Sequence, residues 1–154
     1  MHRPRRSAPA RERGFTLTEM LIAIVLVAIL VSTIGPRIAP VITRNAAGQA
    51  ASLVALDLEH AVSLAGRQRR PVRIACCAQG SYSVTDRANG TLLFRRVVAG
   101  GAGGFGLTGI TFSTPHVDVF PSGQTSAPLT VSLSATTVTR QVAMSTGGFV
   151  RVIR

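Results

Sequence analysis

The sequence predicts an α+β protein in which a long N-terminal helix packs on a C-terminal antiparallel β-sheet domain. Residues 20–34 are almost entirely apolar, and apolar residues recur at i+3 and i+4 across residues 47–65, which indicates a helix up to Gly66. From Pro71 onward, short β-rich runs alternate with turn residues, which indicates antiparallel strands. A helix with one apolar stripe buries it against a sheet, so the two parts form one fold.

The β-rich region contains eight short runs: VRIACC, YSV, TLLFRRVV, ITF, VDVF, LTVSL, VTRQVAM and FVRVI. Asn89-Gly90 lies between the second and third runs and predicts a hairpin turn there. Pro36 lies within the helical region, where a proline removes a backbone hydrogen bond, so we expect a kink or interruption near it.

Charge and hydropathy at the N-terminus predict a membrane topology. All 17 basic residues are arginines, and five of them lie within residues 1–14. Residues 15–35 are long enough, at about 31 Å, to cross a bilayer as a helix. By the positive-inside rule, residues 1–14 are cytoplasmic and residues 36–154 lie outside the cytoplasm. The chain has no second long apolar stretch, which argues against a multi-pass protein.

Glu19 is the residue of this segment that needs an explanation. An ionised side chain in the hydrocarbon costs roughly 2.5 to 3.5 kcal/mol on insertion scales, so it usually has a partner and a function. A cleaved secretory signal would want small residues after the apolar run, where Pro36 and Pro40 fit badly. A plain uncleaved anchor would cross the membrane but would leave Glu19 unexplained.

The segment RGFTLTE at residues 13–19, followed by the apolar helix, resembles the N-terminal signal of type IV prepilins and type II secretion pseudopilins. The resemblance implies that a prepilin peptidase cleaves between Gly14 and Phe15 and methylates the new amine of Phe15. It implies that Glu19 of an incoming subunit pairs with the Phe15 ammonium of its neighbour in a helical filament. It also places Pro36 where such helices commonly kink.

Three further segments resemble minor pilins of the GspH/FimT type: LAGRQRRPVRI at 64–74, FPSGQ at 120–124 and RQVAMSTGGFVRVI at 140–153. The resemblance implies a helix that ends in an arginine-rich turn, a Phe-x-x-Gly turn between later strands, and a final apolar strand. Some minor pilins of this type are thought to bind DNA through basic C-terminal strands. Arg151 and Arg154 are therefore the candidate anion or DNA contacts, although DNA binding is not the favoured function.

The chain's two cysteines are adjacent, at Cys76 and Cys77. This spacing is poor for zinc, which needs four ligands, usually from paired motifs. In an oxidising compartment the two could form a disulfide with each other, pair between molecules, or stay free. If they lie on a strand, their side chains point to opposite faces, which favours thiols packed as small apolar groups over a disulfide between them.

Other polar features are better explained as structure than as chemistry. The arginines from Arg67 to Arg73 fit a solvated helix end, with an acidic partner, lipid headgroup or DNA as the alternative. His116 and Asp118 would share a strand face, but no third metal ligand is evident. The segment GGAGGFG at 100–106 lacks the Lys-Ser or Lys-Thr of a phosphate loop. We expect no catalytic site, metal or cofactor.

These features predict a non-enzymatic filament subunit with four segments: a cleaved leader at 1–14, a transmembrane or filament-core helix at 15–35, the second half of the helix at 36–66, and a periplasmic β domain at 67–154. The expected partners are prepilin peptidase, other pilins or pseudopilins, the inner-membrane assembly platform and the membrane before assembly. A minor pseudopilin of a type II secretion system is favoured, with a minor pilin of a type IV pilus as the alternative. A stand-alone nucleic-acid-binding membrane protein is the third reading.

Overall fold

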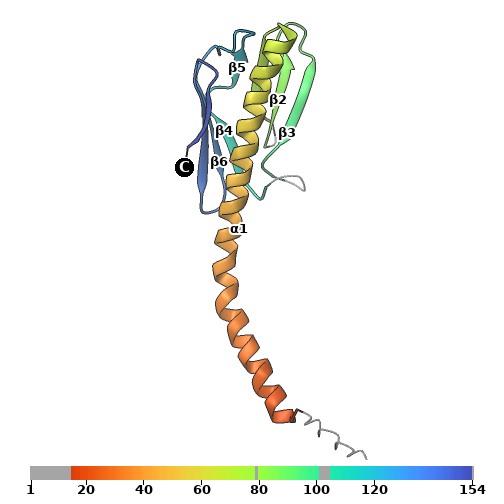
Figure 1. Cartoon of the computed structure of the whole chain (residues 1–154), viewed down its shortest axis with the longest axis vertical. Helices are drawn as coiled ribbons and strands as arrows, with labels where there is room; N and C mark the ends of the chain where they lie inside the picture. The colour runs from red at the N-terminus through yellow and green to blue at the C-terminus, as the bar shows by residue number, and fades with distance from the viewer. Residues whose placement is uncertain (1–14, 79, 101–104, 154) are drawn as a thin grey trace, which may run out of the picture. The chain divides into compact units, whose positions relative to one another are not determined.

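The computed structural model describes residues 15–78, 80–100 and 105–153, leaving aside the side chains of residues 33–37, 39, 77 and 78. One helix, α1 (Leu17–Gln68), precedes all the strands, as predicted. Residues up to Ile38 and residues from Ala39 onward form two compact units. The second unit contains the rest of α1 and all the strands that the structure describes (Figure 1).

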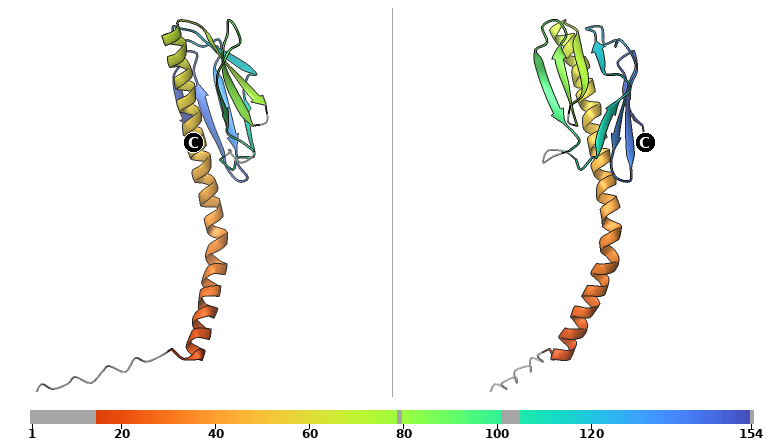
Figure 2. Two further views of the ribbon diagram at one scale, coloured as in Figure 1. Left: turned by 90° about the vertical axis from the view of Figure 1, so that its right-hand side faces the viewer. Right: turned by 180° about the vertical axis from the view of Figure 1, so that it is seen from behind.

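The strands form two antiparallel sheets, where the sequence predicted a sheet domain without resolving its division. The first sheet has four strands in the order β3-β2-β1-β5, and the second has four in the order β4-β6-β7-β8. In the second unit, α1 lies along both sheets (Figure 2). The strand bounds are β1 (Val72–Ala78), β2 (Ser81–Asp86), β3 (Leu92–Val97), β4 (Gly109–Phe112), β5 (His116–Val119), β6 (Leu129–Ser134), β7 (Thr139–Met144) and β8 (Val150–Ile153).

The predicted hairpin between β2 and β3 is present. The N–H of Gly90 donates to the carbonyl of Asp86 at 2.9 Å, and Gly90 has a φ of 71°. The Asn89 side-chain oxygen accepts a hydrogen bond from the N–H of Thr91 at 3.0 Å. Glycine tolerates this left-handed conformation without a steric cost, which explains the Asn-Gly signal.

The predicted apolar stripe of α1 forms the centre of the core. Its six residues are at most 1% exposed: Ala47, Ala50, Val54, Leu58, Ala61 and Ala65. The small alanines let the helix approach the sheets closely. The larger Val54 and Leu58 belong to the same core cluster as buried residues of both sheets. Burying a side chain of valine or leucine size contributes about 1.5 to 3 kcal/mol.

The helix ends two residues later than predicted, because Gly66 does not terminate it. Arg69, just past the last helical residue, takes the left-handed conformation with a φ of 52°. Its N–H donates to the carbonyl of Gly66 at 3.4 Å. Arg69 therefore takes the backbone position that glycine usually fills after a helix.

Two turns touch each other and the helix. Gly123 and Gly148 both have positive φ, at 85° and 78°. A Cβ added to Gly148 would lie 2.2 Å from the carbonyl oxygen of Gly123, and Val62 of α1 lies beneath both turns. Only glycine fits at position 148, so the turn that starts β8 is fixed against the FPSGQ segment.

Candidate functional site

The first turn of α1 is capped by a threonine side chain. The N–H of Glu19 donates to Oγ1 of Thr16 at 3.3 Å, and the N–H of Met20 donates to the carbonyl of Thr16 at 3.1 Å. This is the N-cap arrangement, in which a hydroxyl satisfies an N–H that has no partner within the helix. The cap places the Glu19 carboxylate in the first turn, where the helix dipole favours a negative charge.

The first part of α1 exposes apolar side chains both before and after Glu19. Leu17 is 84% exposed and Ile24 is 67% exposed. The same holds for Met20, Leu21, Ile22, Val25, Leu26, Val27, Ile29, Leu30 and Val31. An apolar surface of this extent indicates contact with other molecules rather than with water. In the part of the chain that the structure describes, no helix combines the length and the apolar character needed to cross a membrane.

Several predicted site residues fall where the structure gives no side-chain description. Gly14 and Arg154 lie outside the described residues, as do the side chains of Pro36 and Cys77. Helix α1 is continuous through Pro36, so the proline does not interrupt it, and the kink stays a prediction.

Cys76 lies half-buried on β1 and is disulfide-bonded. The expectation of a packed free thiol is therefore wrong for Cys76, and the disulfide between Cys76 and Cys77, which the sequence left as the less favoured alternative, stays a hypothesis. Strand β1 changes register between Cys76 and Ala78, so the strict alternation on which that expectation rested is broken there.

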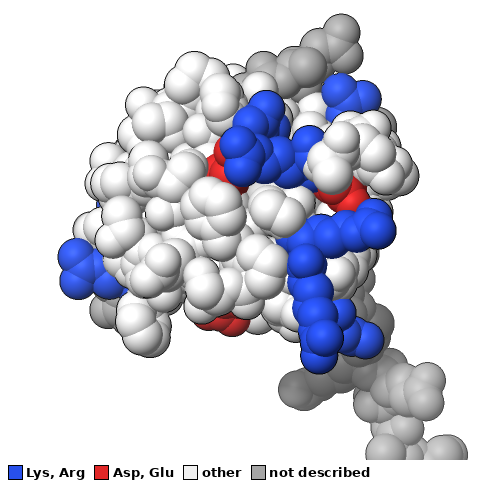
Figure 3. Space-filling view, turned by 90° about the horizontal axis from the view of Figure 1, so that it is seen from above, with Lys and Arg blue, Asp and Glu red and all other residues white. Residues whose placement is uncertain are grey.

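Arginines near the end of α1 and on the first sheet are partly balanced by acids, as the blue and red groups in Figure 3 show. Arg73 makes two hydrogen bonds to Asp118, at 2.7 and 3.1 Å, and Arg87 lies 3.1 Å from the same carboxylate. Arg70 lies 3.8 Å from Asp86. The hydrogen bonds from Arg73 lower the pKa of Asp118, while burial opposes this effect.

Asp118 is thereby engaged by two arginines rather than poised for a metal ion. His116, two residues earlier, is exposed at the start of β5. No group of three or more candidate metal ligands comes together among the described residues. His116 and Asp118 lie on the same strand, and among the described residues no third candidate ligand joins them.

A buried polar cluster joins α1 to the first sheet and was not predicted. The Tyr82 hydroxyl donates to Oδ2 of Asp57 at 2.5 Å, and Arg96 makes two hydrogen bonds to the same carboxylate, at 2.8 and 3.0 Å. Burial, followed by the bond to Asp57, raises the pKa of Tyr82. The missed signal is that Asp57 falls three residues after Val54, on the apolar stripe itself.

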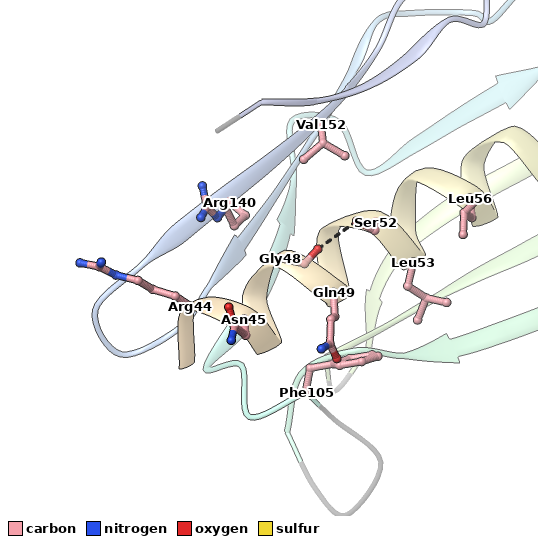
Figure 4. Close-up of a pocket in the computed structure, with 10 residues that line it drawn as sticks. All are labelled: Arg44, Asn45, Gly48, Gln49, Ser52, Leu53, Leu56, Phe105, Arg140 and Val152. Carbon is pink, nitrogen blue, oxygen red and sulfur yellow. Dashed lines mark hydrogen bonds between the residues drawn. The ribbon is translucent and has the colours of Figure 1, made fainter. Parts of the chain in front are cut away.

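An open groove of about 880 Å³ runs along α1, with the second sheet on one side and Phe105, from the segment before β4, on the other (Figure 4). On the helix it is lined by Arg44, Gly48 and Ser52, and on the sheet by Arg140 and Val152. The two arginines lie toward the same end of the groove (Figure 4). Arg151, a predicted contact, is exposed on β8.

Comparison with known families resolves the chain's relationship. Residues 50–148 match the family model for the type II transport protein GspH. The chain belongs to the GspH family. Residues 9–35 also match the prokaryotic N-terminal methylation motif, so this GspH-family chain carries both parts that the sequence predicted. No curated protein sequence matches it significantly.

Solved structures of minor pilins and pseudopilins share this fold. The type IV minor pilin FimU of Pseudomonas aeruginosa has a TM-score of 0.58 at 21% identity, covering 72% of this chain and 90% of FimU. The minor pseudopilin EpsH of the Vibrio cholerae type 2 secretion system has a TM-score of 0.53 at 15% identity, covering 70% of this chain and 95% of EpsH. The predicted α+β fold, with its long N-terminal helix, is thereby confirmed.

Proposed function

We propose that this chain is a minor pseudopilin of a type II secretion system, a non-enzymatic subunit that supports assembly of the pseudopilus and export of folded proteins. Before assembly it is anchored in the inner membrane by residues 15–35, with its N-terminus in the cytoplasm and its β domain in the periplasm. Prepilin peptidase removes residues 1–14 and methylates Phe15. The processed subunit then joins other pseudopilins at the inner-membrane assembly platform.

The observation that carries the proposal is the position of Glu19 on an apolar helix. Its N–H is capped by Thr16, while no partner for its carboxylate is present among the described residues. Phe15, four residues earlier, is 78% exposed just before the helix, within the segment that matches the methylation motif. Cleavage before Phe15 would create an ammonium close to this carboxylate.

The physical role of the pair follows from charge burial. When apolar helices bundle, an isolated carboxylate or ammonium loses its hydration, and each becomes tolerable only beside the other. A pair formed between Glu19 of one subunit and Phe15 of the next has a single allowed stagger, so it sets the register of an open helical assembly. Packing among the exposed apolar side chains then supplies the attraction between helices.

The test compares two acids on α1 in the native host. We expect Glu19→Ala to be processed normally, because the cleavage site is unchanged, yet to be lost from purified filaments. Glu59→Ala removes an exposed acid from the β-domain end of the same helix and should be incorporated as the wild type is. Immunoblots of membrane and filament fractions measure both, and normal incorporation of Glu19→Ala would overturn the proposal.

A minor pilin of a type IV pilus is the second candidate, and the structural likeness to FimU favours it. Deleting the gene and scoring exoprotein secretion beside twitching and transformation separates the two systems. A secretion defect alone assigns the pseudopilus, and a twitching or transformation defect alone assigns the pilus.

DNA uptake would add a role for Arg151, together with Arg154. Each arginine that contacts a phosphate adds about 0.9 to the slope of log affinity against log salt. Arg151→Ala should then reduce both the affinity for duplex DNA and this slope. An unchanged slope would remove Arg151 from any DNA contact.

A further inference from the structure

Strand β8 leaves one edge of the second sheet open. It is the last strand in the order β4-β6-β7-β8, and its pairing with β7 matches Val142 to Val152 and Ala143 to Arg151. The N–H of Ser145 donates to the carbonyl of Phe149 at 2.9 Å, which sets the antiparallel alternation. By that alternation Arg151 bonds to β7, whereas the N–H and C=O of Val150 and Val152 point to the open edge.

The groove runs beside this strand, and among the described residues it has open space above the helix at Gly48. Val152 lines the groove and is 42% exposed. A Cβ added to Gly48 on the opposite wall would have no heavy atom within 4 Å. The helical wall from Arg44 to Leu56 is about 18 Å long at 1.5 Å per residue, which an extended segment of about five residues would fill.

Charge decides what kind of segment fits. Arg44 and Arg140 line the groove, and Nε of Arg140 is shielded from solvent without an acceptor in the described chain. The acids Asp57, Asp86 and Asp118 already pair with other arginines of this unit. Among the described acids of the β-domain unit, this leaves Glu59 without an ion pair. A second copy of the chain therefore offers little negative charge to this groove.

We propose that the groove is a docking site in which an extended, carboxylate-bearing segment of a different protein chain adds as a strand to the open edge of β8. Main-chain hydrogen bonds to Val150 and Val152 give the segment its affinity. Its apolar side chains pack on Leu56 and Val152, and its carboxylate lies beside Arg44 and Arg140. Within the function proposed above, the partner is an acidic neighbouring subunit, so this inference rests on that function for the partner's identity.

The test uses the full chain in detergent micelles and fluorescein-labelled hexapeptides of alternating threonine and valine. Each peptide of one set carries a single glutamate, at its first or its last position. Each has a twin that carries glutamine at the same position. We expect the glutamate peptide to bind about 10-fold more tightly than its glutamine twin in fluorescence anisotropy. The substitutions R44A and R140A together should reduce this preference to less than about 2-fold. Equal binding of the twins to the wild type would overturn the proposal.

Strand addition is tested separately from charge. Val152→Pro removes an N–H that points away from β7, so it should abolish peptide binding while leaving the pairing with β7 in place. Val152→Thr has a similar shape, keeps the N–H and should bind as the wild type does. If Val152→Pro fails to fold, the wild type carries the test: bound peptide must slow amide hydrogen exchange at Val150 and Val152. Peptide binding without this protection would overturn strand addition.

A second copy of the chain remains a measurable competitor. Suppose that the wild type self-associates in light scattering, that Val152→Pro abolishes this association, and that the wild type shows no preference for glutamate peptides. The groove then belongs to a second copy, and the proposal fails. The peptide assay needs no filament and does not involve Glu19. Its failure is therefore distinguishable from a failure of the proposed function, which would appear as normal incorporation of Glu19→Ala.

Discussion

Helix α1 carries acids in both of its parts, and two of them, Asp57 and Glu19, lie in opposite environments. Asp57 is buried and receives hydrogen bonds from Tyr82 and Arg96. Glu19 lies among exposed apolar side chains, and no partner for its carboxylate is present among the described residues. The second part of the helix therefore finds the partners for its buried carboxylate within the chain. The first part needs other molecules to supply a partner for its carboxylate and to cover its apolar side chains.

The largest expected effect on the free energy of unfolding comes from replacing a leucine in the second part of the helix, with a leucine in the first part as the comparison. Leu58 is 1% exposed, so Leu58→Ala should lower the free energy of unfolding by about 3 kcal/mol through lost burial and a cavity. Leu30 is 57% exposed, so Leu30→Ala should change it by less than about 0.5 kcal/mol. Urea unfolding of the full chain in micelles, followed by fluorescence of its single tyrosine, measures both. Equal losses would show that the first part is also stabilised within the chain.

A smaller effect is expected when the acids themselves are removed. Asp57→Ala leaves the buried Tyr82 hydroxyl and the Arg96 guanidinium without their acceptor, which should cost about 2 kcal/mol. This is below the usual range for a buried pair, because the Arg96 side chain is 41% exposed and water screens it. Glu19→Ala should leave the free energy of unfolding unchanged, and its effect should be confined to assembly. A comparable loss from Glu19→Ala would show that Glu19 has a partner within the chain.

The smallest expected effect concerns alkaline pH. Because burial and Asp57 raise the pKa of Tyr82, the folded chain keeps this hydroxyl protonated where the unfolded chain ionises it. The stabilisation is fully present below the unfolded pKa of about 10 and is lost progressively as the pH rises above it. Tyr82→Phe should be less stable at neutral pH by about 1 kcal/mol and should lose this alkaline decline. Circular dichroism during urea unfolding at pH 8 to 11 checks the difference, and parallel declines would contradict it.

Much of the fold was predictable because the periodic signals were strong and local. The stripe from Ala47 to Ala65 and the eight β-rich runs correspond to the observed helix and strands. The division into two sheets was not predictable, since strand order depends on contacts between segments far apart in the sequence. The helix end was missed because Arg69 takes a conformation that normally favours glycine.

The candidate site was predictable only in part. The N-terminal methylation motif was recognisable from the sequence, because residues 13–19 and the apolar run that follows them are contiguous. The partners of Asp57 were not predictable, since Tyr82 and Arg96 approach it only after β2 and β3 pair and pack on the helix. The arginine cluster was expected to be a solvated helix end, whereas Arg73 instead bonds to an acid on β5.

The contact between Gly123 and Gly148 bears on how relatives of this chain should be compared. The lack of a side chain at Gly148 leaves room for the carbonyl of Gly123, and Val62 lies under both glycines, so the FPSGQ and STGG segments pack together as one unit. Selection should therefore act on the two motifs together. A homologue that has a bulkier residue in place of Gly148 should also have a different turn at the FPSGQ segment. Its last strand should leave the domain at a different angle.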